Sequence, residues 1–284
     1  MTAVALTIAG SDSSGGAGIQ ADLKTFAALG VYGASAITAL TAQNTQGVTA
    51  IHDVPADFVA AQIDAVFADL DVGAVKIGML SQASVVETVA SALDRHHAKN
   101  VVLDPVMVAS SGDRLLAPDA VEAVRRLLIP RARVVTPNLP EAALLLDAQA
   151  ARDETQMEAQ ARALIERFNA QAVLIKGGHG KSAESVDLLV EQGSTTRLAE
   201  TRIATRNTHG TGCTLSSAIA AGLAKGLDLA AAVRAAKTYV TAAIAAADML
   251  NVGHGHGPLN HFYEHAHDPE KWGPVFGQDH AQTE

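Results

Sequence analysis

Val4-Ala5-Leu6-Thr7-Ile8 is a short apolar run near the start of the chain, and Ala9-Gly10-Ser11-Asp12 follows it with glycine and polar residues. A segment with helical periodicity comes next, near 19–29. An apolar run that ends in polar residues and leads into a helix is typical of a strand in an α/β sheet. This first strand and helix set a pattern that the rest of the chain repeats.

Short β-branched runs alternate with Ala- and Leu-rich helical segments along the remainder of the chain. We expect strands at 74–77, 101–103, 134–136 and 172–175, and helices near 83–96, 118–128, from 139 onward and near 156–168. A hairpin is expected within 186–201. The alternation predicts an α/β fold with a mostly parallel central sheet flanked by helices. Because no linker divides the chain, we expect one domain over 1–267 and a polar, flexible tail over 268–284.

Composition narrows the class of protein. The chain has 284 residues, 48% hydrophobic but only 4% aromatic, which suits a core of aliphatic side chains. A net charge of −9 without long Lys or Arg clusters argues against nucleic-acid binding and favours a small-molecule partner. The apolar stretch 230–250 contains Arg234, Lys237 and Asp248, so we expect a buried-face helix and no membrane span. A single cysteine and the lack of an export signal predict a cytoplasmic protein.

A glycine-rich turn precedes a helical pattern at Asn207-Thr208-His209-Gly210-Thr211-Gly212-Cys213-Thr214. Apolar residues recur after it with helical period at Leu215, Ile219 and Leu223. The first N–H groups of a helix have no intrahelical partner, and glycines let the backbone approach an oxyanion closely. The turn is therefore predicted to bind a phosphoryl group. The alternative is a helix cap followed by a buried thiol.

The predicted strand ends also nominate a site, because ligands of open α/β sheets bind outside the carboxyl ends of the strands. Five of these ends finish in polar or glycine-rich residues: 9–12 with the glycines at 15, 16 and 18, then 76–79, 104–107, 136–141 and 176–179.

Two patterns that look like nucleotide sites fail on spacing. Gly180-Lys181-Ser182 resembles the end of a P-loop, but Ile175 stands where the first glycine is needed. The loop with Gly15, Gly16 and Gly18 lacks the G-x-G-x-x-G spacing of dinucleotide sites. Neither a P-loop nor nicotinamide binding is expected.

Ordered stretches of the chain resemble the hydroxymethylpyrimidine/phosphomethylpyrimidine kinase family of thiamine biosynthesis, a branch of the ribokinase-like kinases. The resemblance spans about 2–261, and related pyridoxal kinases share much of the pattern. Its most specific stretches are Ile8-Ala9-Gly10-Ser11-Asp12-Ser13-Ser14-Gly15-Gly16-Ala17-Gly18-Ile19-Gln20-Ala21-Asp22 and Thr208-His209-Gly210-Thr211-Gly212-Cys213. Further matches lie at 41–45, 76–80, 102–107, 138–141 and 176–179.

The resemblance implies a ribokinase-like three-layer α/β sandwich that binds ATP and Mg²⁺, often as a homodimer. The implied reaction is transfer of the ATP γ-phosphoryl group to 4-amino-5-hydroxymethyl-2-methylpyrimidine and then to its monophosphate. The backbone N–H groups of Gly210, Thr211, Gly212 and Cys213 would hold the transferring group. Most ribokinase-like enzymes carry a catalytic Asp where Cys213 stands. A helix start lowers the pKa of a thiol, so Cys213 is a candidate base, although a loose transition state asks little of one.

The same resemblance implies metal-binding and nucleotide-binding roles for several residues. For most of them a purely structural interpretation is the alternative. Glu141 would organise Mg²⁺ within Asn138-Leu139-Pro140-Glu141, yet Asn138 and Glu141 also fit a capping box. Asp104 would bind Mg²⁺ through water, or cap a loop. Lys176 would pair with ATP phosphates, or be a surface lysine. Adenine contacts are expected around Lys237.

Pyrimidine recognition is assigned to Gln43, whose carboxamide can pair with a ring nitrogen and an exocyclic amine together. Asp22 is expected to accept from the same amine. By the same resemblance the ring pocket is formed by Gly10, Met79 and Val106. The alternatives are a polar strand end for Gln43, a surface charge for Asp22 and a core residue for Met79.

Two more segments carry expectations. Residues 108–114 contain small residues and could close as a lid, or form an ordinary loop. Histidines at 254, 256, 261, 265 and 267 could suggest a metal tract, but their glycine-rich setting favours a structural end of the domain. His209 is expected to orient the anion-binding turn. The function alternatives are a pyridoxal kinase of the same fold and a non-catalytic sensor of a thiamine precursor.

Overall fold

The computed structural model describes residues 2–107, 116–178 and 183–265. Within these ranges nine strands form one sheet in the order β3-β2-β1-β4-β5-β6-β7-β8-β9. The strands from β2 to β7 in this order run parallel, and β3, β8 and β9 pair antiparallel with their neighbours. Their bounds are β1 Val4–Asp12, β2 Tyr32–Asn44, β3 Gly47–Asp53, β4 Ala74–Ile77, β5 Val101–Leu103, β6 Val134–Val135, β7 Ala172–Lys176, β8 Glu184–Glu191 and β9 Ser194–Thr201.

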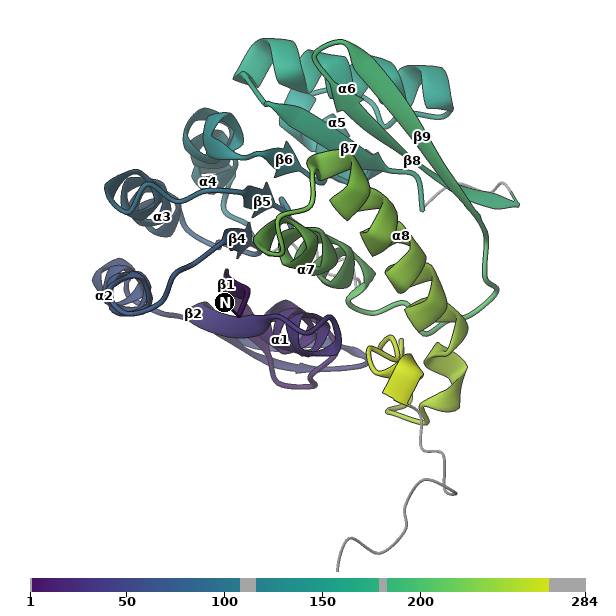
Figure 1. Cartoon of the computed structure of the whole chain (residues 1–284), viewed down its shortest axis with the longest axis horizontal. Coiled ribbons are helices and arrows are strands. Elements are labelled where there is room, and N and C mark those ends of the chain that lie inside the picture. The colour runs from purple at the N-terminus through teal and green to yellow at the C-terminus, as the bar shows by residue number, and fades with distance from the viewer. Residues whose placement is uncertain (1, 108–115, 179–182, 266–284) are drawn as a thin grey trace, which may run out of the picture.

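Helices cover both faces of this sheet, which gives three layers (Figure 1). The helices α1, α7 and α8 pack on one face, and α2 to α6 pack on the other. The bounds are α1 Gly18–Ala28, α2 Ala56–Phe67, α3 Ala83–Arg95, α4 Pro118–Ala123, α5 Leu139–Leu146, α6 Glu154–Phe168, α7 Thr211–Ala224 and α8 Leu229–Ala245, with short helices η1 Val124–Leu128, η2 Ile129–Arg131, η3 Ala247–Met249 and η4 Tyr263–His265. The predicted α/β sandwich with a mostly parallel sheet is confirmed.

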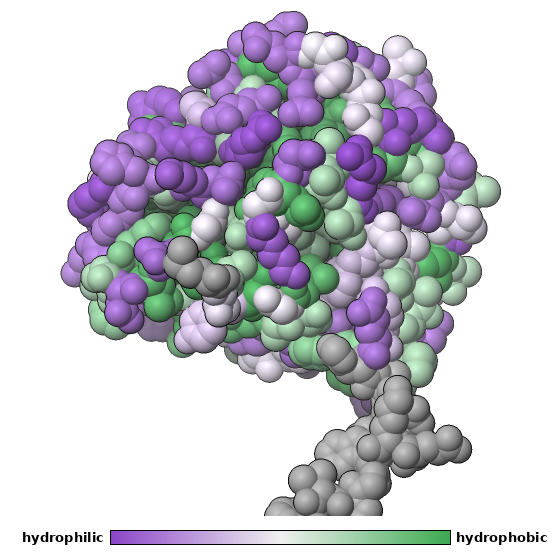
Figure 2. All heavy atoms as spheres, viewed as in Figure 1, coloured by the Kyte–Doolittle hydropathy of each residue, from purple (hydrophilic) through white to green (hydrophobic). Residues whose placement is uncertain are grey.

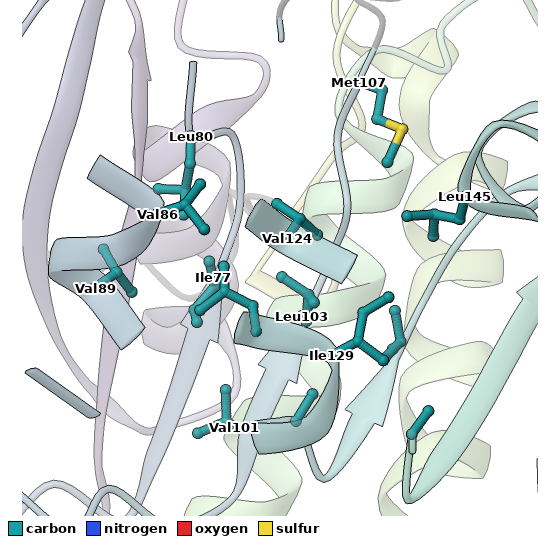
Figure 3. Close-up of a cluster of buried hydrophobic side chains, with 14 of the residues drawn as sticks. Ile77, Leu80, Val86, Val89, Val101, Leu103, Met107, Val124, Ile129 and Leu145 are labelled. Carbon is teal, nitrogen blue, oxygen red and sulfur yellow. The ribbon is translucent and has the colours of Figure 1, made fainter. Parts of the chain in front are cut away.

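Alternation along the central strands divides the core between the two faces. In β1, Leu6 and Ile8 belong to the cluster beneath α2 to α6, whereas Ala5 belongs to the cluster beneath α1, α7 and α8. Every residue of β4 and β5 is buried, as expected for parallel strands with helices on both sides. Figure 3 shows part of the first cluster, in which Ile77 and Leu103 lie among side chains of α3, η1 and η2.

The predicted elements agree closely with the structure, with three omissions. The strands and helices expected from residue 74 onward are all present, and the expected hairpin is β8 and β9. The helix expected over 118–128 divides into α4 and the π-helical turn η1. Neither β2, β3 nor α2 was predicted. Strand β2 is hard to predict because glycine, alanines and polar residues occupy most of it.

Two segments far apart in sequence close one end of the molecule. The N–H of His209 donates to the carbonyl of Gly257 at 3.1 Å, and the N–H of Gly257 donates to the side chain of Asn207. The N–H of Gly255 donates to the hydroxyl of Thr45. These contacts support the structural role expected for the histidine- and glycine-rich segment. The predicted lid at 108–114 and the predicted tail at 268–284 lie outside the described residues, as does His267.

One helical stretch within the described ranges, Leu229–Met249, is long and apolar enough to cross a membrane by length and composition. It comprises α8 and η3, and α8 packs against α7 along the sheet (Figure 1). Its Lys237 is buried and ion-paired with Asp187 of β8. These contacts make α8 a core helix of the sandwich. Figure 2 shows hydrophilic residues over much of the surface in the same view.

Candidate active site

A cavity of about 680 Å³ lies at the carboxyl ends of the parallel strands, where α7 begins. Of the fourteen site residues expected from sequence, all but Asp22 line it. Those that line it are Gly10, Gln43, Met79, Asp104, Val106, Asn138, Glu141, Lys176, Gly210, Thr211, Gly212, Cys213 and Lys237. The folding of distant loops into one cavity gives these residues a shared ligand site.

The predicted anion-binding turn is the start of α7. Gly210 is the N-cap residue with φ of +82°, and a Cβ there would lie 1.9 Å from the carbonyl oxygen of Gly16. Only glycine tolerates both conditions. The N–H of Thr211 donates to the carbonyl of Thr208 at 3.2 Å, so this donor is already engaged. The backbone N–H groups of Gly212 and Cys213, in the first turn of the helix, are therefore the donors that remain for a ligand.

The pKa of the Cys213 thiol differs from the expectation. Its thiol stands at the start of α7, but burial raises its pKa from 9.0 to about 11. The charge of Lys76 and the N–H of Gly18 favour the thiolate without outweighing burial and the nearby carboxylates of Asp22 and Asp104. The expected lowering of the pKa by the helix start is wrong. In the ligand-free protein Cys213 is a neutral thiol at pH 7.

A lysine and two carboxylates converge on the cavity beside Gly212. Lys176 Nζ lies 2.8 Å from Asp104 Oδ1 and 3.9 Å from Glu141 Oε2. Burial and the charge of Asp104 raise the pKa of Glu141 to about 7, against the opposing charge of Lys176. Burial would lower the pKa of Lys176, but Asp104 and Glu141 raise it well above its usual range. Lys176 is thus a permanent cation next to the anion-binding turn.

The capping box expected at the start of α5 is present. The N–H of Glu141 donates to Asn138 Oδ1 at 2.8 Å, and the N–H of Asn138 donates to Glu141 Oε2 at 2.7 Å. Pro140 occupies the first turn of the helix. The box fixes the Glu141 carboxylate on the cavity wall. Both interpretations of this segment are therefore compatible in one geometry.

The residues expected at the pyrimidine also belong to the cavity wall. Gln43 stands near the end of β2, where the pairing with β3 shifts register between Ala42 and Gln43. A Cβ on Gly10 would lie 2.7 Å from the Met79 methyl group, so glycine makes room for Met79. Val106 also lines the cavity.

Asp22 corrects one expectation. Its side chain has no exposed surface, and it accepts hydrogen bonds from Thr7, Lys76 and Ser217 at 2.6 to 2.8 Å. All its partners belong to the fold, so it does not line the cavity or present an acceptor to a ligand. Its role here is to pair with Lys76, a fully buried lysine that sequence reasoning did not single out as a functional residue.

Asp12 is a second residue whose importance the sequence did not reveal. Its carboxylate accepts N–H groups of Ser14, Gly16 and Ala17 and so organises the glycine loop before α1. It also lies 2.8 Å from His209 Nε2. Burial would raise the pKa of Asp12, but hydrogen bonds from His209 and Ser14 lower it to about 2. The expectation that His209 orients the turn fits this contact.

Lys237 reaches the cavity from α8. Its Nζ lies 2.7 Å from Asp187 Oδ2, and the N–H of Gly177 donates to Asp187 Oδ1 at 2.9 Å. Asp187 was missed because a single aspartate within an apolar strand has no local signature. The adenine contact expected of Lys237 remains a prediction.

The fold and this site define an α/β kinase of the ribokinase-like class, with a glycine-rich helix start beside a lysine–carboxylate cluster at the strand ends. Residues 12–260 match the phosphomethylpyrimidine kinase family. The chain belongs to this family, the hydroxymethylpyrimidine/phosphomethylpyrimidine kinases of thiamine biosynthesis.

Individual relatives agree. The chain is 62% identical over 263 residues to the hydroxymethylpyrimidine/phosphomethylpyrimidine kinase of Rhizobium meliloti, covering 93% of this chain and 98% of that one. Among solved structures, it resembles phosphomethylpyrimidine kinase from Clostridium difficile with TM-score 0.75 and 44% identity, over 85% of this chain and 99% of that one. An ADP complex of Bacillus subtilis pyridoxal kinase matches with TM-score 0.85 and 37% identity, over 94% and 100%.

Proposed function

We propose that this kinase transfers the γ-phosphoryl group of ATP to the 5-hydroxymethyl oxygen of 4-amino-5-hydroxymethyl-2-methylpyrimidine, and then phosphorylates the resulting monophosphate. The observation that carries the proposal is a single cavity lined by the anion-binding turn, the Lys176 cluster and the Gln43 carboxamide. Phosphoryl transfer depends on positioning and on charge neutralisation, and this cavity supplies both.

At the phosphate end, the backbone N–H groups of Gly212 and Cys213 hold the oxygens of the transferring group. Lys176 neutralises their charge, because its pKa stays high and its Nζ lies against the turn. Cys213 places its thiol beside the acceptor hydroxyl, and we assign it a positioning role. A resting thiolate is not required, since a loose transition state asks little of a base.

Magnesium fits the cluster on chemical grounds. Asp104 and Glu141 are buried carboxylates around one lysine, and oxygen ligands of this kind are those that Mg²⁺ prefers. The raised pKa of Glu141 indicates that a second negative charge there lacks full compensation. These two residues would hold the ion, which when bound neutralises charge on the nucleotide phosphates.

At the other end, the pyrimidine ring lies between Met79 and Val106, with its amine and ring nitrogen on Gln43. Asp22 takes no part in this contact. We place the nucleotide on the side of Lys237, which lines the same cavity. The Bacillus subtilis pyridoxal kinase that shares this fold is an ADP complex.

Pyridoxal is the second candidate substrate, because the pyridoxal kinase named above shares the fold at TM-score 0.85. Its identity to this chain, 37%, is well below the 62% of the pyrimidine kinase. The pyrimidine assignment is therefore preferred. A sensor without catalysis is disfavoured, because Lys176, Glu141 and the turn at the start of α7 are all in place.

Mass spectrometry of products tests the proposal. The protein is incubated with Mg-ATP and, separately, with hydroxymethylpyrimidine, its monophosphate or pyridoxal. We expect conversion of the first two through to the diphosphate. Phosphorylation of pyridoxal alone would move the assignment to vitamin B6 salvage.

We further propose that the protein acts as a cytoplasmic homodimer. The hairpin of β2 and β3 exposes one large apolar side chain on each of its faces, Leu40 at 46% and Ile51 at 41%, and a second copy could cover one of these faces. Light scattering of the purified protein would report a mass twice that of the chain. A monomeric mass at micromolar concentration would refute this assembly.

A further inference from the structure

We propose that His209, held by Asp12, determines which way round the Gln43 carboxamide faces the pyrimidine, and so acts as a positioning residue for substrate recognition. The inference rests on the proposed pyrimidine kinase function. It concerns three side chains that line the same end of the cavity, Thr41, Gln43 and His209.

The first step concerns the hydrogen on His209. Its Nε2 lies 2.8 Å from Asp12 Oδ2, and both side chains are buried. Asp12 is a carboxylate that only accepts, because it is ionised and already receives several N–H groups. Nε2 must therefore carry a hydrogen. This fixes the tautomer of His209 whether or not the ring is charged.

The second step concerns the end of Gln43 that meets His209. Gln43 Nε2 lies 3.4 Å from His209 Nε2, so in the orientation that the structure records two N–H donors face each other. The hydrogen on His209 Nε2 is donated to Asp12, but a carbonyl oxygen beside that N–H is favoured over an NH₂ group, so we infer that the carboxamide is turned by 180°. An NH₂ group in this place would set two donors against each other. His209 thus selects one of the two orientations of the carboxamide.

Thr41 selects the same orientation independently. Its hydroxyl lies 2.9 Å from the carbonyl oxygen of Ser11 and 3.0 Å from Gln43 Oε1, two acceptors that its one hydrogen cannot both serve. The Ser11 oxygen can only accept, whereas turning the carboxamide puts its NH₂ group at the second contact, so both contacts are satisfied when the hydroxyl donates to Ser11. Thr41 then offers Gln43 a lone pair, and the amide group facing it must be the NH₂. His209 and Thr41 therefore favour the same orientation of the Gln43 carboxamide.

The consequence is a fixed donor and acceptor order at the cavity. With its oxygen on the side of His209 and its nitrogen on the side of Thr41, Gln43 retains one lone pair and one N–H for a ligand. An aminopyrimidine matches this edge with its exocyclic amine and its ring nitrogen. A reversed carboxamide would face the ligand with the opposite order, so recognition depends on the orientation being fixed before binding.

His209 also connects recognition to the phosphate end. It precedes Gly210, the N-cap of α7, and its ring would collide with a Cβ on Gly16, at 2.4 Å. The ring is thus wedged between the glycine loop and the anion-binding turn. If His209 had a purely structural role, its replacement would disturb that turn and so change the KM for ATP. If His209 positions Gln43, its replacement changes the preference for the substrate with the 4-amino group instead. Kinetic measurements therefore distinguish the two roles.

The test compares hydroxymethylpyrimidine with its analogue that lacks the 4-amino group. His209→Met removes the donor at similar size, and His209→Gln retains an N–H donor. We expect His209→Met to reduce the preference for the amino substrate, as a ratio of kcat/KM values, by at least about tenfold. The KM for ATP should stay within about twofold, and His209→Gln should restore most of the preference. His52→Met on the exposed strand β3 is the matched control.

Two further variants make the result decisive. In a Gln43→Ala background, His209→Met should have almost no additional effect on the preference, because both act through one contact. Thr41→Val should reduce the preference as well, by removing the acceptor for the carboxamide NH₂, and it applies even where His209→Met does not fold. Additive effects of His209 and Gln43, or an unchanged preference in Thr41→Val, would overturn the inference. An inactive wild-type protein would overturn the proposed function with it.

Discussion

Lys76 Nζ lies 2.8 Å from Asp22 Oδ2, and neither side chain has any exposed surface. The carboxylate of Asp22 also accepts hydrogen bonds from Thr7 of β1 and Ser217 of α7. One carboxylate on α1 thereby joins β1, β4 and α7. Ser217 lies one turn beyond Cys213, so this buried ion pair fixes the start of α7 against the sheet.

Breaking this ion pair from one side should be costly. We expect Lys76→Met or Asp22→Asn to lower the free energy of unfolding by about 3–5 kcal/mol, because each leaves an uncompensated group in the core. Chemical denaturation measures the loss. The double variant Lys76→Met with Asp22→Leu should be less destabilised than the sum of the single variants. An additive double variant would show that the two residues do not act as a pair.

Replacement of Gly210 should be far more damaging than replacement of another left-handed glycine. Gly210 and Gly226 have φ of +82° and +86°, but only a Cβ on Gly210 meets another atom, the oxygen of Gly16. We expect Gly226→Ala to cost about 1 kcal/mol from backbone conformation alone. Gly210→Ala should cost at least about 3 kcal/mol and abolish turnover. Thermal unfolding and kinase assays compare the two, and equal effects would contradict the close approach.

Glu141 should make stability fall as pH rises between about 4.5 and about 7. Burial raises its pKa in the folded protein to about 7 from 4.5, so the folded state binds more protons than the unfolded state in this range. The effect should reach about 1–3 kcal/mol in the ligand-free protein. Denaturation across this pH range measures it against Glu141→Gln, which should lack this component. Parallel pH profiles for the two proteins would show that Glu141 does not titrate as described.

Cys213 should alkylate slowly in the folded protein. It is the single cysteine of the chain, so iodoacetamide reports on it alone. Burial raises its pKa to about 11, compared with 9.0 for an unperturbed thiol. Between pH 7 and 9 we expect a rate on the order of a hundredfold below that of the denatured chain. A rate that levels off below pH 8 would indicate a thiolate and restore the case for a base.

Local sequence signals were sufficient for elements with strong periodicity or distinctive ends. Strands β4 and β5 are short apolar runs with both faces buried, and α5 begins with a capping box readable in four residues. Strands β2 and β3 were not predicted, because glycine, alanines and polar residues occupy most of β2 and exposed residues fill the middle of β3. Their pairing depends on contacts with β1, which no local window contains.

Among the site residues, the contrast between Gln43 and Asp22 is the most instructive. Both were assigned to the same amine, but β2 carries Gln43 to the cavity whereas α1 turns Asp22 into the core beside Lys76. Their positions in the sequence do not tell which of the two side chains lines the cavity and which lies in the core. The direction of a side chain and its partners depend on how α1, β1 and β4 pack.

The sequence by itself determined the chemical inventory of this protein: the glycine turn before α7, the capping box with Glu141, Lys176 at a strand end and the order of the strands and helices other than β2, β3 and α2. These depend on local backbone preferences and on short-range periodicity. Only the tertiary structure decided the protonation of Cys213, the pairing of Asp22 with Lys76 and the contact of Asp12 with His209. The physical reason is that burial and charge act through space, between residues that the chain separates by as many as 197 positions.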